Sequence, residues 1–383
     1  MRPLEGTVVL EFCQFLSGPS AGLRLADLGA RVIKIERPDT GDLCRQLYIG
    51  NLDYNGESAL FQTINRNKES YSADLKHPGQ LQGIKRLIGQ ADVLIENFRP
   101  GTMEKLGLDY ESVKSINPRI VYASVTGYGK EGPWRDKPGQ DLLVQSLSGL
   151  VWLNGDSDQP PLPFGLAVAD MLAGAHLVQG ILACLVRRGR SGEGGLVEVS
   201  LLESLLDFQF EVFTTYLNDG GRPPQRSSIN GAHAYLGAPY GIYETQDGYI
   251  ALAMGSVLKL GELLGCRELS AFADPKEWFA RRDEIKTILA AHLRSRPTRE
   301  WLALLESADY WCSDVLTWEQ LTEHEAFKAL DMLQVTRASG GTAFKTTCCP
   351  IRMNGIRLKS PKGAPRVGED SRKIAAEFGF TPS

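Results

Sequence analysis

The sequence is poor in the residues that build metal sites and disulfide frameworks. It contains only five histidines in 383 residues, and they form no cluster. Its seven cysteines are odd in number, and no two of them form a Cys-x-x-Cys pair. We therefore expect no disulfide framework, no metal ion and no tightly bound cofactor.

A strong excess of charge is missing as well. The formal net charge is −4, and charged residues make up 23% of the chain. This balance provides no general attraction to nucleic acid or to an anionic membrane, so any site for phosphate groups must be local. The first residues do not form a basic segment followed by an apolar run, and we expect a cytoplasmic protein without a secretory signal.

Only one stretch, residues 166–186 (LAVADMLAGAHLVQGILACLV), is apolar over a long distance. A helix that is apolar on all sides must lie in a protein core or in a membrane. The stretch is about as long as a membrane span, but Asp170, His176 and Gln179 would be costly in lipid. We interpret it as a buried helix of a soluble protein.

Asp170 is the one acidic residue of this stretch. A carboxylate in an apolar interior is costly unless it is hydrogen-bonded or paired. As an N-cap, it would accept the free backbone N–H groups of the first helical turn. Alternatively, the same placement keeps a nearly dry carboxylate ionised, so that it can act as a nucleophile. The stretch on its own favours the cap.

The N-terminal region has the pattern of a βαβ unit. Residues 6–12 are an apolar, β-branched run, a turn with helical spacing follows at 17–28, and 30–36 form a second such run. This succession predicts a parallel sheet. Further buried strands are predicted at 69–74, 91–97, 120–126 and 195–200. The predicted fold class is α/β, with a doubly wound parallel-sheet domain.

The first turn lacks the Gly-x-Gly-x-x-Gly pattern of dinucleotide-binding proteins. Its two glycines, Gly18 and Gly22, are more typical of a turn packed closely against a helix. Glu36 does end the second strand, where a dinucleotide-binding protein has the acid that binds ribose. A nicotinamide-dependent oxidoreductase is therefore a distant alternative.

A change of pattern divides the chain near residue 225. Residues 218–228 are rich in glycine, proline and arginine, as linkers are, and a β-hairpin is predicted within 240–253. We expect three parts: a large Rossmann-like domain (1–224), a smaller α+β domain (225–330) and a C-terminal segment that returns to the large domain (331–383).

Several segments have an order and spacing that are highly specific, although none is decisive alone. They are Leu16-Ser-Gly-Pro19, 28–36, 73–76, 91–101, 122–129, 140–149, Ala169-Asp170 and 238–241. In these segments the chain resembles the class III CoA-transferase family, which includes formyl-CoA, carnitine and dicarboxylate CoA-transferases. The resemblance covers nearly the whole chain. It implies a large doubly wound domain, a small domain and an interlocked homodimer of two threaded chains.

The resemblance assigns the nucleophile of the family to Asp170. In the family's reaction this carboxylate attacks the thioester of an acyl-CoA, which gives an acyl–aspartyl anhydride and CoA thiolate. The thiolate then forms an enzyme–CoA thioester, and an acceptor carboxylate reverses the sequence. Each step conserves an activated carboxyl group, so ATP and metal ions are not needed. The expected substrates are an acyl-CoA and a small carboxylic acid, with dicarboxylic acids as candidates.

The resemblance also implies a CoA-binding site made of cations and backbone donors. The residues expected along CoA are Arg37, Ala73, Lys76, Asn97, Phe98, Lys105 and Lys137. Phe15 and Ser17 lie in the turn that lines the thioester in relatives. Leu16 replaces a glutamine that some relatives have, so the role of that glutamine is not transferred.

Two other functions compete with CoA transfer. An α-methylacyl-CoA racemase shares the family's fold but needs an acid–base pair to remove and return a proton. Racemases carry a histidine in a Gly-His-Asp stretch, whereas this chain has Gln140 there, and glutamine cannot take up the proton. A CoA-binding module without activity would leave Asp170 with no role besides capping.

Overall fold

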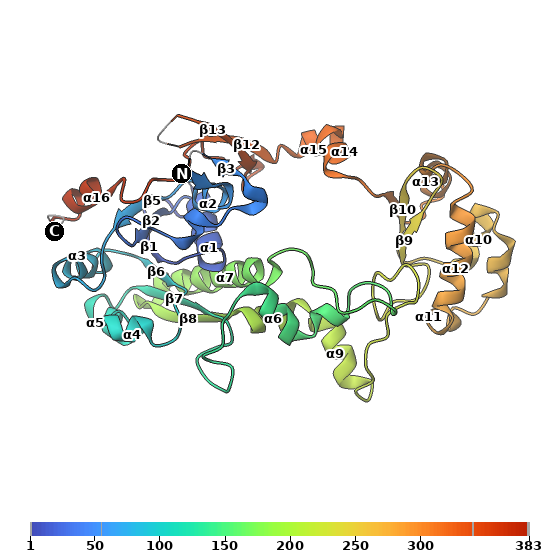
Figure 1. Cartoon of the computed structure of the whole chain (residues 1–383), viewed down its shortest axis with the longest axis horizontal. Coiled ribbons are helices and arrows are strands. Elements are labelled where there is room, and N and C mark those ends of the chain that lie inside the picture. Colours follow the sequence, from blue (N-terminus) through green and yellow to red (C-terminus); the bar gives the residue numbers. More distant parts are fainter. Residues whose placement is uncertain (1, 55, 339–340, 381–383) are drawn as a thin grey trace. The chain divides into compact units, whose positions relative to one another are not determined.

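The computed structural model describes residues 2–54, 56–338 and 341–380, which form two compact units (Figure 1). Unit 1 comprises the described parts of 1–144, 167–208 and 330–383. Unit 2 comprises 145–166 and 209–329. The division differs from the predicted boundary at residue 224, because two segments before that residue belong to unit 2.

Unit 1 is built on a six-stranded parallel sheet with the order β5-β2-β1-β6-β7-β8. The strands are β1 (Val8–Phe12), β2 (Arg31–Glu36), β5 (Glu69–Ser72), β6 (Val93–Glu96), β7 (Val121–Thr126) and β8 (Gly195–Ser200). In the central register, Val9 lies between Val32 of β2 and Val93 of β6. The predicted α/β class with a parallel sheet is confirmed. The strand order reverses between β1 and β6, where ligands of such sheets bind at the carboxyl ends of the strands.

Helices cover both faces of this sheet (Figure 1). On one face, side chains such as Leu10, Ile33 and Leu94 form a core with α3 (Pro78–Ile88), α4 (Thr102–Leu106), α5 (Tyr110–Ile116) and α16 (Ser371–Glu377). On the other face α1 (Ser17–Asp27) packs against α7 (Val168–Ser191), and these contact α2 (Ala59–Asn65) and α8 (Leu201–Phe208) respectively. The result is a three-layer α/β/α unit.

Helix α7 is longer than the helix predicted at 166–186, and it is not buried on all sides. Ala173, Leu177 and Ile181 are buried, whereas Met171 and Ala183 are exposed within this chain. The helix is long and apolar enough to cross a membrane. Its buried face, however, packs on α1 and on β7 and β8 as part of unit 1. The run of apolar residues does not distinguish the packed face from the open one.

Gly174 allows the close approach of α7 to α1. A Cβ atom at this position would lie 2.2 Å from Ser20 Oγ and 2.8 Å from the carbonyl oxygen of Ser17. Because Asp170 lies one helical turn before Gly174, this contact brings the start of α7 next to the start of α1.

Unit 2 contains a three-stranded antiparallel sheet with the order β11-β10-β9. The strands are β9 (Gly241–Glu244), β10 (Tyr249–Leu252) and β11 (Cys312–Asp314). Tyr243 and Trp301 are buried in its core. The helices of this region are α9 (Phe210–Asn218), α10 (Val257–Leu264), α11 (Glu277–Ala280), α12 (Arg282–Leu293), α13 (Thr298–Ser307), α14 (Trp318–Glu323) and α15 (Glu325–Leu330). Helix α6 (Asp141–Ser148) begins in unit 1 and ends in unit 2.

The C-terminal segment lies along the open edge of β5. Asp370 Oδ2 accepts the Ser70 N–H at 3.0 Å, and Ser371 Oγ accepts the Ser72 N–H at 3.0 Å. These bonds protect an edge that would otherwise offer free backbone groups. Short antiparallel pairs complete the unit: β3 (Asp53–Tyr54) with β4 (Glu57–Ser58), β12 (Leu333–Arg337) with β13 (Ala343–Thr347), and β14 (Arg352–Met353) with β15 (Ile356–Arg357).

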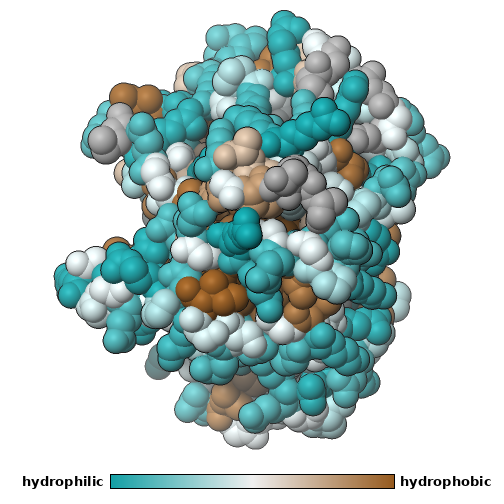
Figure 2. All heavy atoms as spheres, turned by 90° about the vertical axis from the view of Figure 1, so that its left-hand side faces the viewer, coloured by the Kyte–Doolittle hydropathy of each residue, from teal (hydrophilic) through white to brown (hydrophobic). Residues whose placement is uncertain are grey.

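The side of the molecule on which α3 and α16 lie in Figure 1 is shown as a surface in Figure 2. It is mainly hydrophilic, and its hydrophobic patches are small and separated. This face has the character of an ordinary solvent-facing surface.

Candidate active site

A pocket of about 270 Å³ lies beyond the carboxyl ends of β1 and β6, at the point where the strand order reverses. Five of the residues predicted along CoA line it: Arg37, Ala73, Lys76, Phe98 and Lys105. They come from the ends of β2, β5 and β6 and from α4. The fold thus brings together residues that are far apart in the sequence.

The pocket combines cations with an apolar wall. Arg37, Lys76 and Lys105 are exposed, so their charges are available to a ligand that carries several negative charges. Ala73 is buried and Phe98 is half-buried. This arrangement suits a molecule with both phosphate groups and an apolar portion.

Asn97 does not line this pocket but holds the turn after β1. Its side-chain oxygen accepts the Gln14 N–H at 2.9 Å, and its amide donates to the Gln14 carbonyl at 2.8 Å. The same amide lies 3.5 Å from Ser17 Oγ. Phe15, in this turn, is 46% exposed and has a left-handed backbone conformation with φ +63°. The turn therefore connects the pocket to the start of α1.

The N-cap interpretation of Asp170 is wrong. The N-cap of α7 is Ala167, and Asp170 is the third residue of the helix. Asp141 supplies the missing acceptor instead, because its Oδ2 accepts the Asp170 N–H at 3.1 Å. A second carboxylate, buried at the start of α6, thus caps the helix and leaves the Asp170 side chain for another role.

Burial and, next, the neighbouring charge of Asp141 raise the pKa of Asp170 from its usual value of 3.8. A hydrogen bond with the Ser17 side chain lowers it, and the net result is a pKa of about 7. The surroundings therefore oppose ionisation, contrary to the expectation that the start of the helix keeps this carboxylate fully charged. Near neutral pH both the protonated and the ionised forms are populated.

Two glycines bring Asp141 into place. Gly127 and Gly139 pass so closely that a Cβ on either would lie 2.6 Å from the Cα of the other. This crossing closes the base of the intervening loop just before Asp141. Lys137 is exposed on that loop and does not line the pocket, unlike the other predicted cations.

The ribose-binding role considered for Glu36 is contradicted by its surroundings. Glu36 is only 3% exposed. Its carboxylate accepts hydrogen bonds from Arg45 at 2.7 and 2.9 Å, from the Ser70 hydroxyl at 2.6 Å and from the Asp42 N–H at 2.9 Å. Because these internal partners occupy its carboxylate, Glu36 is not placed to bind the ribose of a nicotinamide cofactor.

The sequence model that describes CoA-transferase family III matches residues 4–371 of this chain, and this match decides the family. The chain belongs to this family. Class III CoA-transferases act on acyl-CoA and carboxylic acids, so the predicted family and enzyme class are confirmed.

Several known proteins are similar to this chain over nearly its whole length. It is 33% identical to the succinate–glutarate CoA-transferase of Agrobacterium fabrum, over 98% of this chain and 96% of the relative. It is 31% identical to the acetyl-CoA:oxalate CoA-transferase of Acetobacter aceti, with 98% and 96% covered. The crystal structure of a CAIB/BAIF family protein from Brucella suis has a TM-score of 0.84 at 31% identity, with 98% and 99% covered.

Sequence reasoning missed two acidic residues beside the site, Asp141 and Asp42. Asp141 caps α7, and Asp42 lines the pocket. The available signals were weak: Asp141 follows Gly139-Gln140, and Asp42 follows a glycine in a polar loop. Neither pattern indicates which distant backbone group the carboxylate will accept.

Proposed function

We propose that this class III CoA-transferase moves CoA from an acyl-CoA to a small carboxylic acid, with Asp170 as the nucleophile. The observation that carries the proposal is the place of the Asp170 carboxyl, at the adjoining starts of α7 and α1. Ser17 and Asn97 connect this carboxyl to the turn that lines the cationic pocket. Asp141 caps the helix, so Asp170 itself is left to react.

The cationic pocket is the proposed CoA site. Arg37, Lys76 and Lys105 bind the phosphate groups, and Ala73 and Phe98 contact the apolar portions. Lys137 approaches CoA from the exposed loop, Phe15 and Ser17 face the thioester, and Asn97 holds the turn that carries them.

The proposed reaction has two covalent intermediates. The ionised Asp170 attacks the thioester carbonyl, and the C–S bond breaks. CoA leaves as a thiolate, and the enzyme retains an acyl–aspartyl anhydride. The thiolate attacks the aspartyl carbonyl and releases the donor's carboxylate, which leaves an enzyme–CoA thioester. The acceptor carboxylate then passes through the same two steps in reverse. A dry site protects the anhydride from water.

We propose a small dicarboxylic acid as the acceptor and succinyl-CoA as a donor. The support comes from the relatives, whose names include glutarate, oxalate and D-citramalate as substrates. A screen of mono- and dicarboxylic acids against succinyl-, acetyl- and formyl-CoA, with the acyl-CoA products identified by mass spectrometry, tests this proposal. Transfer to a dicarboxylic acid is expected. Deuterium uptake at the α-carbon of an acyl-CoA without any transfer would instead identify a racemase.

We also propose that two chains form an interlocked homodimer. The exposed face of α7 supports this, because Met171, Ala175, Ala183 and Val186 are apolar yet uncovered within one chain. A second chain covering this face would give α7 the buried surroundings that its composition predicts.

A further inference from the structure

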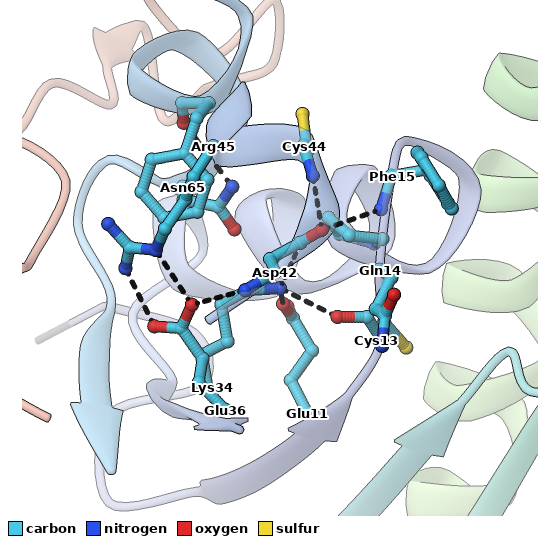
Figure 3. Close-up of polar contacts among 12 residues, drawn as sticks. Glu11, Cys13, Gln14, Phe15, Lys34, Glu36, Asp42, Cys44, Arg45 and Asn65 are labelled. Atoms are coloured by element: carbon cyan, nitrogen blue, oxygen red, sulfur yellow. Dashed lines mark hydrogen bonds and ion pairs between the residues drawn. The ribbon is translucent and has the colours of Figure 1, made fainter. Parts of the chain in front are cut away.

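The turn formed by residues 13–15, between β1 and α1, is held by side chains from other parts of unit 1 (Figure 3). The Lys34 ammonium donates to the Cys13 carbonyl at 2.7 Å. Asp42 Oδ1 accepts the Phe15 N–H at 3.1 Å. Together with the two bonds from Asn97, these contacts fix four consecutive backbone groups.

The backbone of Phe15 needs such support. Its φ of +63° lies in the left-handed region, which a residue with an aromatic side chain rarely adopts. A conformation of this kind persists only where the surroundings determine it, and it is often found at functional sites. The bond to Asp42 holds the amide of Phe15 in this orientation.

Asp42 is itself held firmly. Its Oδ2 lies 2.8 Å from Lys34 Nζ, and Lys34 Nζ lies 3.0 Å from Glu11 Oε1. Glu11 also pairs with Lys68, at 2.8 Å, and all four side chains are fully buried. Because the ion pair fixes one carboxylate oxygen, the other stays aimed at the Phe15 N–H and at the Cys44 N–H, which it accepts at 3.1 and 2.9 Å.

We propose that Asp42 is a positioning residue for CoA transfer, which acts by fixing the Phe15 turn that presents Ser17 to Asp170. This inference rests on the proposed function. For this role Asp42 provides an acceptor oxygen in the correct place, and its negative charge orients that oxygen through the ion pair with Lys34. The phosphate-binding cations lie elsewhere in the pocket, so the effect falls on turnover and not on the affinity for CoA.

Two substitutions test this role. In Asp42→Asn only one acceptor oxygen remains, so the amide NH2 must face either Lys34 or the Phe15 and Cys44 N–H groups, all of which are donors. Asp42→Glu keeps the charge but moves the oxygens by one methylene group. We expect both variants to lower kcat, and the single-turnover rate of enzyme–CoA formation, by roughly 10- to 100-fold, with KM for acyl-CoA within about 3-fold. If neither variant folds, Asp42→Ala removes the acceptor without adding volume.

Asp27→Asn is the matched control. Asp27 is also a buried acid of unit 1, but it pairs with Arg66 at 2.6 and 3.0 Å at the other end of α1. This variant is expected to lower Tm without changing kcat of the folded enzyme.

Three results would contradict the role of Asp42: a wild-type kcat in folded Asp42→Asn and Asp42→Glu, an equal loss of kcat in Asp27→Asn, or an effect on KM alone. Each of these leaves the proposed function intact, because the wild type still transfers CoA. A wild type that neither transfers CoA nor forms the CoA adduct would contradict the proposed function itself.

Discussion

The proposed attack of Asp170 on a thioester requires the ionised carboxylate, and the surroundings of Asp170 make ionisation difficult. Burial and Asp141 raise its pKa to about 7. Because the reactive form is the deprotonated one, we predict that kcat/KM falls about tenfold per pH unit below pH 7 and levels off above it. The measurement is a pH profile of transfer with substrates that do not titrate in this range. An acid limb near pH 4 would contradict it.

Asp141→Asn tests the cause of this raised pKa. The amide oxygen of asparagine can still accept the Asp170 N–H, so the helix cap is kept. Loss of the negative charge removes one of the two effects that raise the pKa of Asp170. We predict that the acid limb of kcat/KM moves to lower pH by roughly half a unit to one unit. An unchanged limb would show that burial alone sets it.

The raised pKa also predicts an effect on stability. A carboxyl whose folded pKa lies above its unfolded value binds its proton more tightly when folded. Its contribution to the free energy of unfolding is therefore lost as pH rises from about 4 to 7. Asp170→Asn removes this loss, so the variant should be more stable than the wild type by about 1–3 kcal/mol at pH 8 and no more stable at pH 4. Thermal unfolding at both pH values checks this prediction.

At the scale of elements, the site depends on the contact between α7 and α1 at Gly174. A methyl group there would meet the backbone oxygen of Ser17 at 2.8 Å, so Gly174→Ala must push the two helices apart. We predict a loss of about 1–3 kcal/mol in stability and at least a tenfold lower kcat.

Gly189→Ala, on the same helix, is the control for this substitution. Apart from the adjacent backbone of α7 itself, no atom of the described residues lies within 4 Å of the Cβ position of Gly189. Alanine favours a helix by about 0.5–1 kcal/mol over glycine. Unfolding curves and kcat of both variants decide the prediction. Equal behaviour of the two variants would contradict it.

Local patterns in the sequence predicted most elements of unit 1. The β-branched runs at 30–36 and 120–126 correspond to β2 and β7, and Leu28-Gly29 marks the end of α1. The apolar spacing over 103–116 predicts a single helix, but this segment forms α4 and α5, because Gly107 takes a left-handed conformation that ends α4. The spacing of apolar residues and the residues typical of element ends thus predict which helices and strands exist. They predict less well whether a helix is continuous or interrupted.

The site was less predictable than the fold. The pocket residues followed from the family resemblance, since exposed cations such as Arg37 and Lys76 carry no local signal of a ligand. Asp141 accepts the N–H of Asp170, which is 29 residues away in the chain, and Asp42 accepts the N–H of Phe15, which is 27 residues away. Such pairings are set by tertiary packing, which no local pattern encodes.

At the scale of the whole molecule, the open face of α7 predicts a second chain. Sedimentation equilibrium at micromolar concentration should give twice the mass of the chain. Because threaded chains cannot separate without unfolding, we expect no dissociation on dilution to nanomolar concentration. A stable, active monomer would contradict the interlocked dimer.

The proposed enzyme–CoA thioester is the central claim, and intact-protein mass spectrometry tests it most directly. The enzyme is incubated with an acyl-CoA and no acceptor, and is then treated with hydroxylamine or borohydride. We predict that CoA becomes attached, that the reagents convert Asp170 to a hydroxamate or an alcohol, and that Asp170→Asn forms no adduct. Peptide mapping should locate the product within 166–177. Transfer of CoA by a wild type that forms no adduct, or an adduct on another residue, would contradict the account.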